Sequence, residues 1–163
     1  MPSRATFDAE VVHNFRDIGA SIASGYPVDG MIVIPCSVKT LGAIASGVSE
    51  NLLVRAADVT LKERRRLVLC VRETPLHLGH LWAMVTATEI GAIIAPPMPA
   101  FYSNPESLDD VVDHIVARAL SLIGVHVPAA PPWQGTPASA TRTGDQERPG
   151  DADPATVLGR PAW

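Results

Sequence analysis

The chain has 163 residues, of which 47% are hydrophobic and 18% are charged, so it can bury one sizeable core. Its formal net charge of -4 and pI near 5.7 exclude a general attraction to nucleic acid or to an anionic membrane surface. The sequence has no apolar run of membrane-spanning length and no signal-peptide core after Met1, so we expect a cytoplasmic protein.

Three short apolar runs are expected to be strands of a parallel sheet. They cover about residues 31–34, 67–71 and 92–95, and each is apolar on both faces, as buried parallel strands are. Helical patterns fill the gaps between them. The sequence therefore predicts an α/β fold with helices on both faces of the sheet.

Five helices are predicted from apolar periodicity and from residues that start or stop helices. They cover about residues 14–24, a stretch that begins at Ser37, about residues 51–63, residues 78 to about 91, and a stretch from Ser107 to Gly124. The fourth helix is marked by Leu78, Leu81, Trp82 and Val85.

The last helix has the clearest start signal, because the Ser107 hydroxyl can accept the amide of Asp110. Its apolar stripe is expected to face the sheet and consists of Val111, Val112, Ile115, Val116, Ala119, Leu120 and Ile123. Residues 128–163 hold seven of the fifteen prolines and no apolar periodicity. We therefore expect one domain over 1–127 and a largely disordered tail over 128–163.

The two cysteines lie at or near the ends of short apolar runs that are predicted to be buried strands. Cys36 follows the first run and Cys70 lies in the second. Packed, reduced thiols are favoured over a disulfide framework, because buried free cysteine behaves as a small apolar residue.

Polar clusters follow each predicted strand, and parallel α/β sheets bind ligands at that edge. Ser37–Thr40 follow the first strand, Arg72–Thr74 the second, and Phe101-Tyr102 the proline-rich exit of the third. The first cluster suits an anion or a polar ring edge, or is an ordinary capped helix. In the second cluster, Arg72 and Glu73 either form a structural ion pair or belong to a site, in which Arg72 binds an anion and Glu73 transfers a proton.

The remaining candidate side chains each leave two interpretations open. Arg55 and Lys62 share a helix face and belong either to a site or to a solvated basic stripe. The Arg118 side chain either lies along the apolar stripe with its charged end in water, or binds a phosphate. Tyr102 is either a core aromatic or a ligand contact. His77 and His80 lie three residues apart, but nothing completes a zinc set, so no metal is expected.

Five sequence blocks together make the chain resemble the UbiX-type flavin prenyltransferase family, within the superfamily of homo-oligomeric flavin-containing cysteine decarboxylases. The resemblance runs from about Asp17 to Val127. The blocks are Pro35-Cys36-Ser37-Val38-Lys39-Thr40-Leu41, Arg55-Ala56-Ala57-Asp58-Val59, Leu61-Lys62-Glu63-Arg64-Arg65, Arg72-Glu73-Thr74-Pro75-Leu76 and Pro97-Met98-Pro99-Ala100-Phe101-Tyr102.

The resemblance implies a flavodoxin-like or Rossmann-like three-layer fold and a prenyltransferase activity. Such enzymes join the dimethylallyl group of dimethylallyl phosphate to reduced FMN without a metal. They pass the prenylated FMN to a partner UbiD-type decarboxylase, in ubiquinone synthesis or in aromatic-acid breakdown. A homo-oligomer, commonly a dodecamer with sites shared between subunits, is also implied.

The same resemblance assigns roles to individual residues. FMN is assigned to Ser37, Val38, Lys39, Thr40 and Arg72. Catalysis is assigned to Glu73, Lys62 and Arg55, where cationic donors stabilise the charge that separates as phosphate leaves and Glu73 transfers a proton. Dimethylallyl phosphate is assigned to Tyr102, Arg118 and Trp133.

The chain also departs from the family pattern at its start. The family opens with a strand, a glycine-rich turn and a helix, and Gly19, Gly25 and Gly30 have no such spacing. We therefore expect an N-terminally truncated sheet that lacks part of the flavin site. The alternatives are a cysteine-decarboxylating flavoprotein of the same fold and a non-catalytic subunit kept for assembly.

Overall fold

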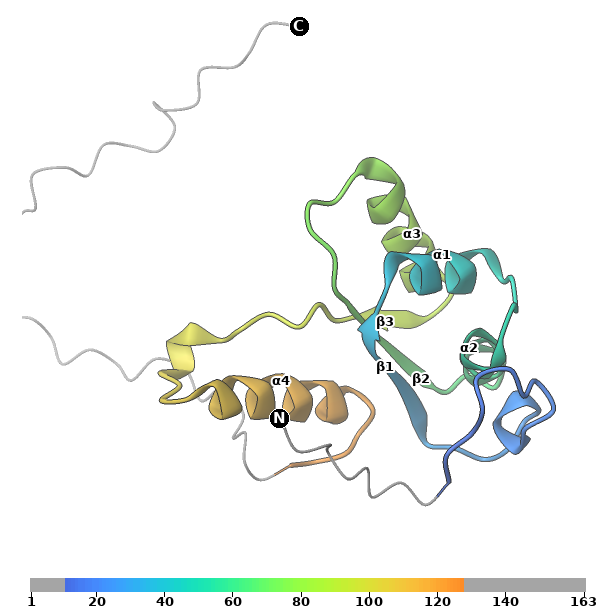
Figure 1. The fold of residues 1–163 in the computed structure, drawn as a ribbon, viewed down its shortest axis with the longest axis horizontal. Coiled ribbons are helices and arrows are strands. Elements are labelled where there is room, and N and C mark those ends of the chain that lie inside the picture. Colours follow the sequence, from blue (N-terminus) through green and yellow to red (C-terminus); the bar gives the residue numbers. More distant parts are fainter. Residues whose placement is uncertain (1–10, 128–163) are drawn as a thin grey trace, which may run out of the picture. The chain divides into compact units, whose positions relative to one another are not determined.

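A computed structural model describes residues 11–127 of the chain (Figure 1). Its elements, in chain order, are a 3-10 helix at Ser21–Ala23, β1 (Gly30–Cys36), α1 (Val38–Ser46), α2 (Leu52–Lys62), β2 (Arg66–Val71), α3 (Leu78–Glu89), β3 (Ala92–Ile94), a 3-10 helix at Phe101–Ser103 and α4 (Leu108–Leu122). The tail predicted over 128–163 lies outside the described residues.

The three strands form one parallel sheet in the order β1-β2-β3, as the sequence predicts. Gly30 pairs with Arg66 at the start of β1, and Leu67 pairs with Ala92 at the start of β3. The register between β1 and β2 is irregular between Val33 and Cys36. Because the strands are parallel, their carboxyl ends lie at the same edge of the sheet.

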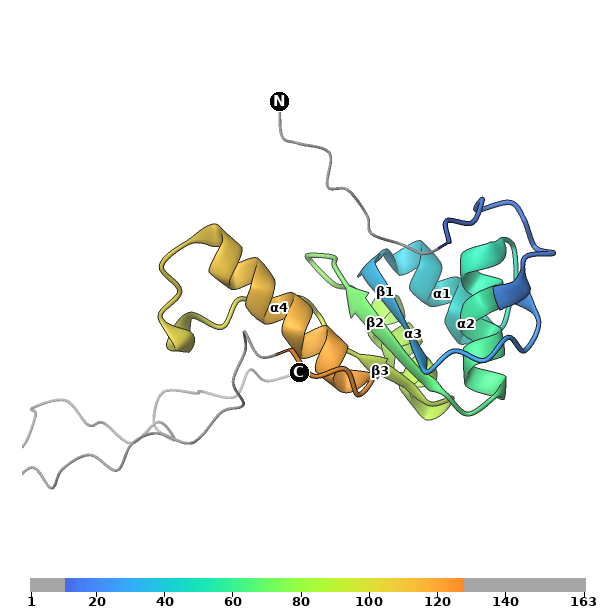
Figure 2. The same cartoon turned by 90° about the horizontal axis from the view of Figure 1, so that it is seen from below.

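Helices cover both faces of the sheet, and β2 divides its side chains between them (Figures 1 and 2). Leu67, Leu69 and Val71 pack in one core cluster with residues of α1, α2 and α3. Val68 and Cys70 point to the other face and pack against Ala119 of α4. This alternation buries every residue of β2 after its first, as the continuous apolar run predicts.

Side-chain caps start the helices where the sequence places them. The Oγ of Ser37 accepts from the amide of Thr40, and the Oδ1 of Asn51 accepts from the amide of Val54. Ser107 forms a full capping box with Asp110. These contacts satisfy amides that the first turn of a helix leaves without an intrahelical acceptor.

The helix predicted over 14–24 is wrong, because only Ser21–Ala23 form a short 3-10 turn there. Asn14 and Asp17 explain the difference. The Oδ1 of Asn14 accepts from the amide of Arg16, and the Oδ1 of Asp17 accepts from the amide of Gly19. Such short side-chain acceptors compete with helical hydrogen bonding and favour turns.

The stripe predicted on α4 faces the sheet only at its end. Ala119, Leu122 and Ile123 pack against the sheet, whereas Val112 and Val116 are 48% and 40% exposed. The N-terminal half of α4 passes beyond the sheet (Figure 2).

None of the helices within residues 11–127 combines the length and the apolarity that crossing a bilayer requires.

Candidate functional site

Ser37 and Thr40 place two hydroxyls at the carboxyl end of β1. Ser37 Oγ lies 3.2 Å from the Thr40 amide and 3.1 Å from Thr40 Oγ1. Val38 and Lys39 belong to the first turn of α1, whose amides have no intrahelical acceptor. The Lys39 side chain is 84% exposed, and its ammonium lies 3.9 Å from the carboxylate of Glu50. The capped helix end thus presents hydroxyl and amide groups that suit an anion or a polar ring edge.

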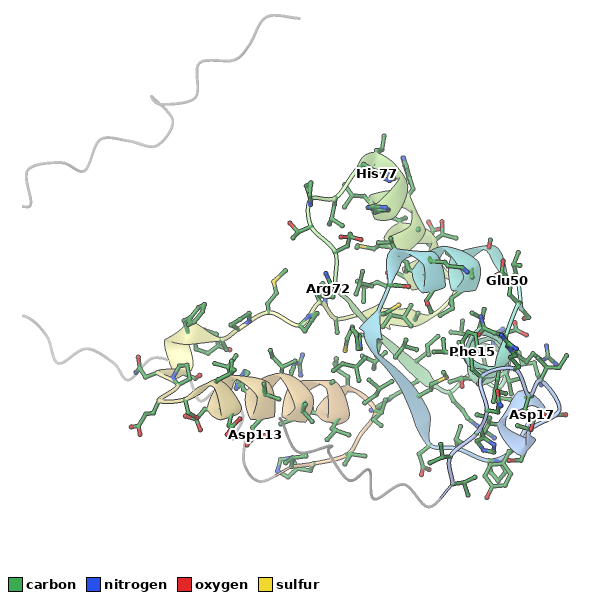
Figure 3. The ribbon with its side chains drawn as sticks, viewed as in Figure 1. Phe15, Asp17, Glu50, Arg72, His77 and Asp113 are labelled. Carbon is green, nitrogen blue, oxygen red and sulfur yellow. The ribbon has the colours of Figure 1, made fainter. Side chains whose placement is uncertain are left out.

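Arg72 and Glu73 follow β2 and lie beside this helix start. The Arg72 amide donates to the Cys36 carbonyl at 3.1 Å, which holds the end of β2 against the end of β1 (Figure 3). Glu73 Oε1 accepts from the Thr74 amide at 3.0 Å. In the described part of the chain, neither side chain forms an ion pair. The structural ion pair considered from the sequence is therefore not found there.

Tyr102 and Arg118 line one pocket between α4 and the segment that leaves β3. The pocket has a volume of about 290 Å³, and Cys70 and Ala95 contribute to it from the strands. Among the described residues, the guanidinium of Arg118 forms one hydrogen bond, to the Ser121 hydroxyl, at 3.3 Å between Nη1 and Oγ, and the residue is exposed. The pocket therefore offers a cation and a phenol to a ligand of the size of a small phosphate ester.

His114 also lines this pocket and was missed by sequence reasoning. It lies one helical turn before Arg118, and its ring meets the Tyr102 ring edge-on with 6.4 Å between the centroids. The signal was present in the sequence, because residues four apart share a helix face.

Arg55 and Lys62 are held away from these groups, on α2. Arg55 donates to the Ala23 carbonyl at 3.2 Å and pairs with Asp58 at 2.9 Å. Lys62 contacts Glu63 just before β2 begins. Lys62 and Arg72 thus lie at opposite ends of β2, whose six residues span about 20 Å. Within one copy, Lys62 is therefore away from the carboxyl edge of the sheet, and Arg55 is bound to Ala23 and Asp58 instead of to Ser37, Arg72 or Glu73.

The two cysteines are buried free thiols, as expected. Burial, with Cys70 nearby, raises the pKa of Cys36 to about 11, and burial also raises the pKa of Cys70. Both groups are therefore neutral thiols near pH 7, which makes them poor nucleophiles although Cys70 lines the pocket.

His77 and His80 stack on each other at the start of α3, with 3.6 Å between ring centroids. His77 Nδ1 accepts from the Gly79 amide and so caps the helix. Across residues 11–127, no three histidine, cysteine or acidic side chains gather as a metal would need. Trp133, assigned to dimethylallyl phosphate from the resemblance, lies outside the described residues.

Comparisons with known proteins identify related chains. The sequence model of the flavoprotein family matches residues 5–120. The chain is 56% identical over 128 residues to the flavin prenyltransferase UbiX of Neisseria meningitidis serogroup B, covering 78% of this chain and 68% of that protein. It is 56% identical over 130 residues to flavin prenyltransferase UbiX of Escherichia coli K12, covering 78% of this chain and 69% of that protein.

Solved structures agree with the sequence comparisons. The crystal structure of AnUbiX (PadA1) in complex with FMN and dimethylallyl pyrophosphate superposes with a TM-score of 0.76 at 49% identity, covering 79% of this chain and 69% of that one. A dodecameric FMN-dependent UbiX-like decarboxylase from Escherichia coli O157:H7 superposes with a TM-score of 0.74 at 52% identity, covering 78% and 69%.

Proposed function

The chain belongs to the flavoprotein family and, within it, to the UbiX-type flavin prenyltransferases, and we propose that it joins the dimethylallyl group of dimethylallyl phosphate to reduced FMN. One observation carries the proposal at the level of the site. Ser37, Thr40, Arg72 and Glu73 come from separate motifs, and the hydrogen bond from the Arg72 amide to the Cys36 carbonyl brings them to one edge. That edge is where parallel sheets hold ligands.

The groups at the carboxyl edge fit FMN by their chemistry. The start of α1 supplies the hydroxyls of Ser37 and Thr40 and the first-turn amides, and Arg72, whose amide is bonded to the Cys36 carbonyl, supplies a guanidinium from the neighbouring strand end. Such donors bind phosphate and the polar edge of a flavin ring. The reduced flavin, when bound, supplies the ring that accepts the prenyl group. Val38 and Lys39 complete the proposed flavin-binding set.

Arg118 and Tyr102 are proposed to hold the phosphate of the prenyl substrate in their pocket. The guanidinium keeps its positive charge at all relevant pH values, so it can neutralise phosphate both before and after the carbon–oxygen bond breaks. The apolar wall of the pocket, which includes Ala95 and Pro96, suits the dimethylallyl group. The Tyr102 phenol can add a hydrogen bond to the leaving phosphate.

Glu73 is proposed to move protons at the carboxyl edge. Its carboxylate accepts only the neighbouring Thr74 amide among the described residues, so its second oxygen is available to a ligand. The proton is delivered to the departing phosphate oxygen, or is taken from the flavin ring as the new ring closes. In either case Glu73 determines the rate of prenylation and not the binding of FMN or dimethylallyl phosphate.

Arg55 and Lys62 are proposed to act in the site of a neighbouring copy. Within one chain Lys62 precedes the start of β2 and Glu73 follows its end, and Arg55 is bound to the Ala23 carbonyl and to Asp58, so neither cation contacts Glu73. A homo-oligomer, up to the dodecamer of the solved relative, would place the end of one copy against the carboxyl edge of the next. The product is proposed to pass to a UbiD-type decarboxylase in the cytoplasm.

The proposal is tested by anaerobic single-turnover mixing of reduced FMN and dimethylallyl phosphate with the protein, followed by absorbance. Arg118→Ala should weaken prenyl phosphate binding by about ten- to a hundredfold, the value of a charge-assisted hydrogen bond, while FMN affinity stays unchanged. Glu73→Gln should slow adduct formation by about 10²–10⁴ while both ligands still bind.

Equilibrium dialysis of FMN provides the matched control. Ser37→Ala combined with Arg72→Ala should lose FMN, whereas Arg118→Ala should retain it. If Glu73→Gln forms the adduct at the wild-type rate, or if Arg118→Ala loses FMN instead of the prenyl phosphate, the assigned roles are wrong.

A further inference from the structure

Arg118 and Ser121 are joined by a reciprocal pair of hydrogen bonds on α4. The Arg118 Nη1 donates to the Ser121 hydroxyl oxygen at 3.3 Å, and the same hydroxyl donates to the Arg118 carbonyl at 2.7 Å. Because the carbonyl holds its hydrogen, the Ser121 hydroxyl meets the guanidinium only as an acceptor. The reciprocal pair thus gives the end of the Arg118 side chain a fixed partner on its own helix.

The atom that Ser121 engages leaves one complete edge of the guanidinium open. Nη1 lies on the side that faces Cδ, whereas the Nε–H and one N–H of Nη2 point in parallel from the opposite side. Within residues 11–127, Arg118 forms no ion pair and no other side-chain hydrogen bond. Two parallel N–H groups are the arrangement that binds two oxygens of a phosphate at once. The open edge of Arg118 therefore has the geometry that a phosphate group requires.

Ser121 engages Arg118 from outside the pocket. The residues of α4 that line the pocket are His114, Ile115, Arg118 and Ala119, and Ser121 follows them toward the C-terminal end of the helix. Residues three apart share a helix face, which places the hydroxyl beside the arginine. The hydroxyl takes up none of the pocket's volume, so a ligand and Ser121 are compatible with the same position of the guanidinium.

We propose that Ser121 is a positioning residue, which holds the Arg118 guanidinium in the orientation that binds the phosphate of the prenyl substrate. Bidentate binding depends on the direction of the guanidinium plane, and an acceptor on Nη1 sets that direction. Ser121 itself does not touch the substrate. This inference rests on the proposed function, which assigns Arg118 to the phosphate.

The test compares variants that remove or keep the hydroxyl at position 121. Ser121→Ala removes the acceptor and favours the helix, whereas Ser121→Thr keeps a hydroxyl that bonds to a carbonyl one turn earlier. The matched control is Ser46→Ala on α1. Ser46 is also exposed, and its hydroxyl donates to the Gly42 carbonyl at 2.8 Å. It forms no hydrogen bond with an arginine among the described residues.

Calorimetric titration of the full chain loaded with oxidised FMN measures the binding of dimethylallyl phosphate, because prenyl transfer requires reduced FMN. Ser121→Ala should raise the dissociation constant by about threefold to tenfold, the value of one hydrogen bond. Ser121→Thr and Ser46→Ala should stay within about twofold of the wild type. Inorganic phosphate, titrated without FMN, should show the same pattern, because Ser121 acts on the phosphate and not on the prenyl group. FMN affinity should not change.

A double-mutant cycle separates positioning from a structural role. In the Arg118→Ala background, the further change Ser121→Ala should alter the dissociation constant by less than about twofold, since no guanidinium is left to orient. Circular dichroism should show the same helix content in every variant. An equal loss with and without Arg118 would show that Ser121 does not act through the guanidinium, and would overturn the proposal.

Two further results also count against the proposal. Wild-type binding by Ser121→Ala beside weak binding by Arg118→Ala refutes the role of Ser121 and leaves the proposed function intact, and so does an equal loss in Ser121→Thr and Ser121→Ala. Wild-type binding by Arg118→Ala refutes the assignment of Arg118 to the phosphate, and the inference about Ser121 fails with it.

Discussion

Cys36 illustrates how burial sets chemistry at a single residue. Its side chain is fully buried, and burial raises its pKa to about 11. A thiol whose pKa is raised on folding binds its proton more tightly in the folded chain than in the unfolded one. This contribution to stability is complete below the unfolded pKa of about 9 and is lost as the pH rises through about 11.

We therefore expect alkaline destabilisation that depends on Cys36. Between pH 8 and pH 10.5, the wild type should lose about 2 kcal/mol of unfolding free energy more than Cys36→Ala, because alanine has no proton to lose. Urea unfolding of both proteins at each pH measures this difference. Equal pH dependence of the two proteins would show that the thiol does not titrate as its burial requires.

His114 is the residue whose contribution to the pocket the sequence reasoning overlooked. If its imidazole donates to the prenyl phosphate, His114→Phe should weaken that ligand by about threefold to tenfold, the value of one hydrogen bond. His114→Gln keeps a donor and should weaken it less. Titration with dimethylallyl phosphate measures both, with FMN affinity as the control that should not change.

Two glycines give opposite predictions at the level of elements. A Cβ on Gly30 would lie 3.0 Å from both the Arg66 carbonyl and the Ile123 side chain, where β1 meets the end of α4. A Cβ on Gly42, inside α1, would meet nothing within 4 Å. The close approach at β1 therefore requires glycine, whereas the helix position does not.

We expect Gly30→Ala to destabilise the protein by about 1–3 kcal/mol through overpacking. Gly42→Ala should stabilise it by about 0.5–1 kcal/mol, because alanine restricts the unfolded chain and favours a helix. Thermal unfolding of the two variants beside the wild type measures both shifts. A stabilising Gly30→Ala would mean that α4 moves aside at no cost.

The elements that the sequence predicted correctly are those with local signals. Ser37, Asn51 and Ser107 each start a helix with a side-chain cap, and the continuous apolar run of β2 is buried on both faces. The helix predicted over 14–24 failed because Asn14 and Asp17 form local turns. Periodicity identified α3 and α4 as helices. It did not show which of their apolar residues would remain exposed, because that depends on where the sheet ends.

The site was predictable only in part for a similar reason. Residues that directly follow a strand, such as Ser37 and Arg72, were placed correctly because parallel strands end at one edge. The positions of Arg55 and Lys62 relative to that edge depend on the path of α2, which no local motif specifies. Their contacts, with Ala23 and Asp58 for Arg55 and with Glu63 for Lys62, become visible only in three dimensions.

One prediction concerns the oligomer, because it requires Lys62 and Glu73 from two different copies. If the α2 cations serve a neighbouring site, Lys62→Ala and Glu73→Gln should each be nearly inactive alone. Oligomers formed from both variants together should regain part of the activity, because some sites then combine an intact Lys62 with an intact Glu73. Co-expression with two different tags, followed by tandem purification and a prenylation assay, measures this recovery.

The control for this experiment combines both changes in one copy and mixes it with a Glu73→Gln copy. No copy in those oligomers carries Glu73, so no activity should return. Absence of recovery in the mixture of the two single variants would place Lys62 and Glu73 in the site of the same copy, and activity in the control would show that Glu73 is not required.

The segment that leaves β3 has a consequence for the entropy of binding. Pro96, Pro97 and Pro99 occupy three of the four positions between Ala95 and Ala100, and all three line the pocket with Arg118. Proline fixes one backbone torsion angle, so this wall has few alternative conformations to lose when a ligand enters. The pocket is thereby ordered before the substrate arrives, and less of the interaction energy with the phosphate is offset by ordering the chain.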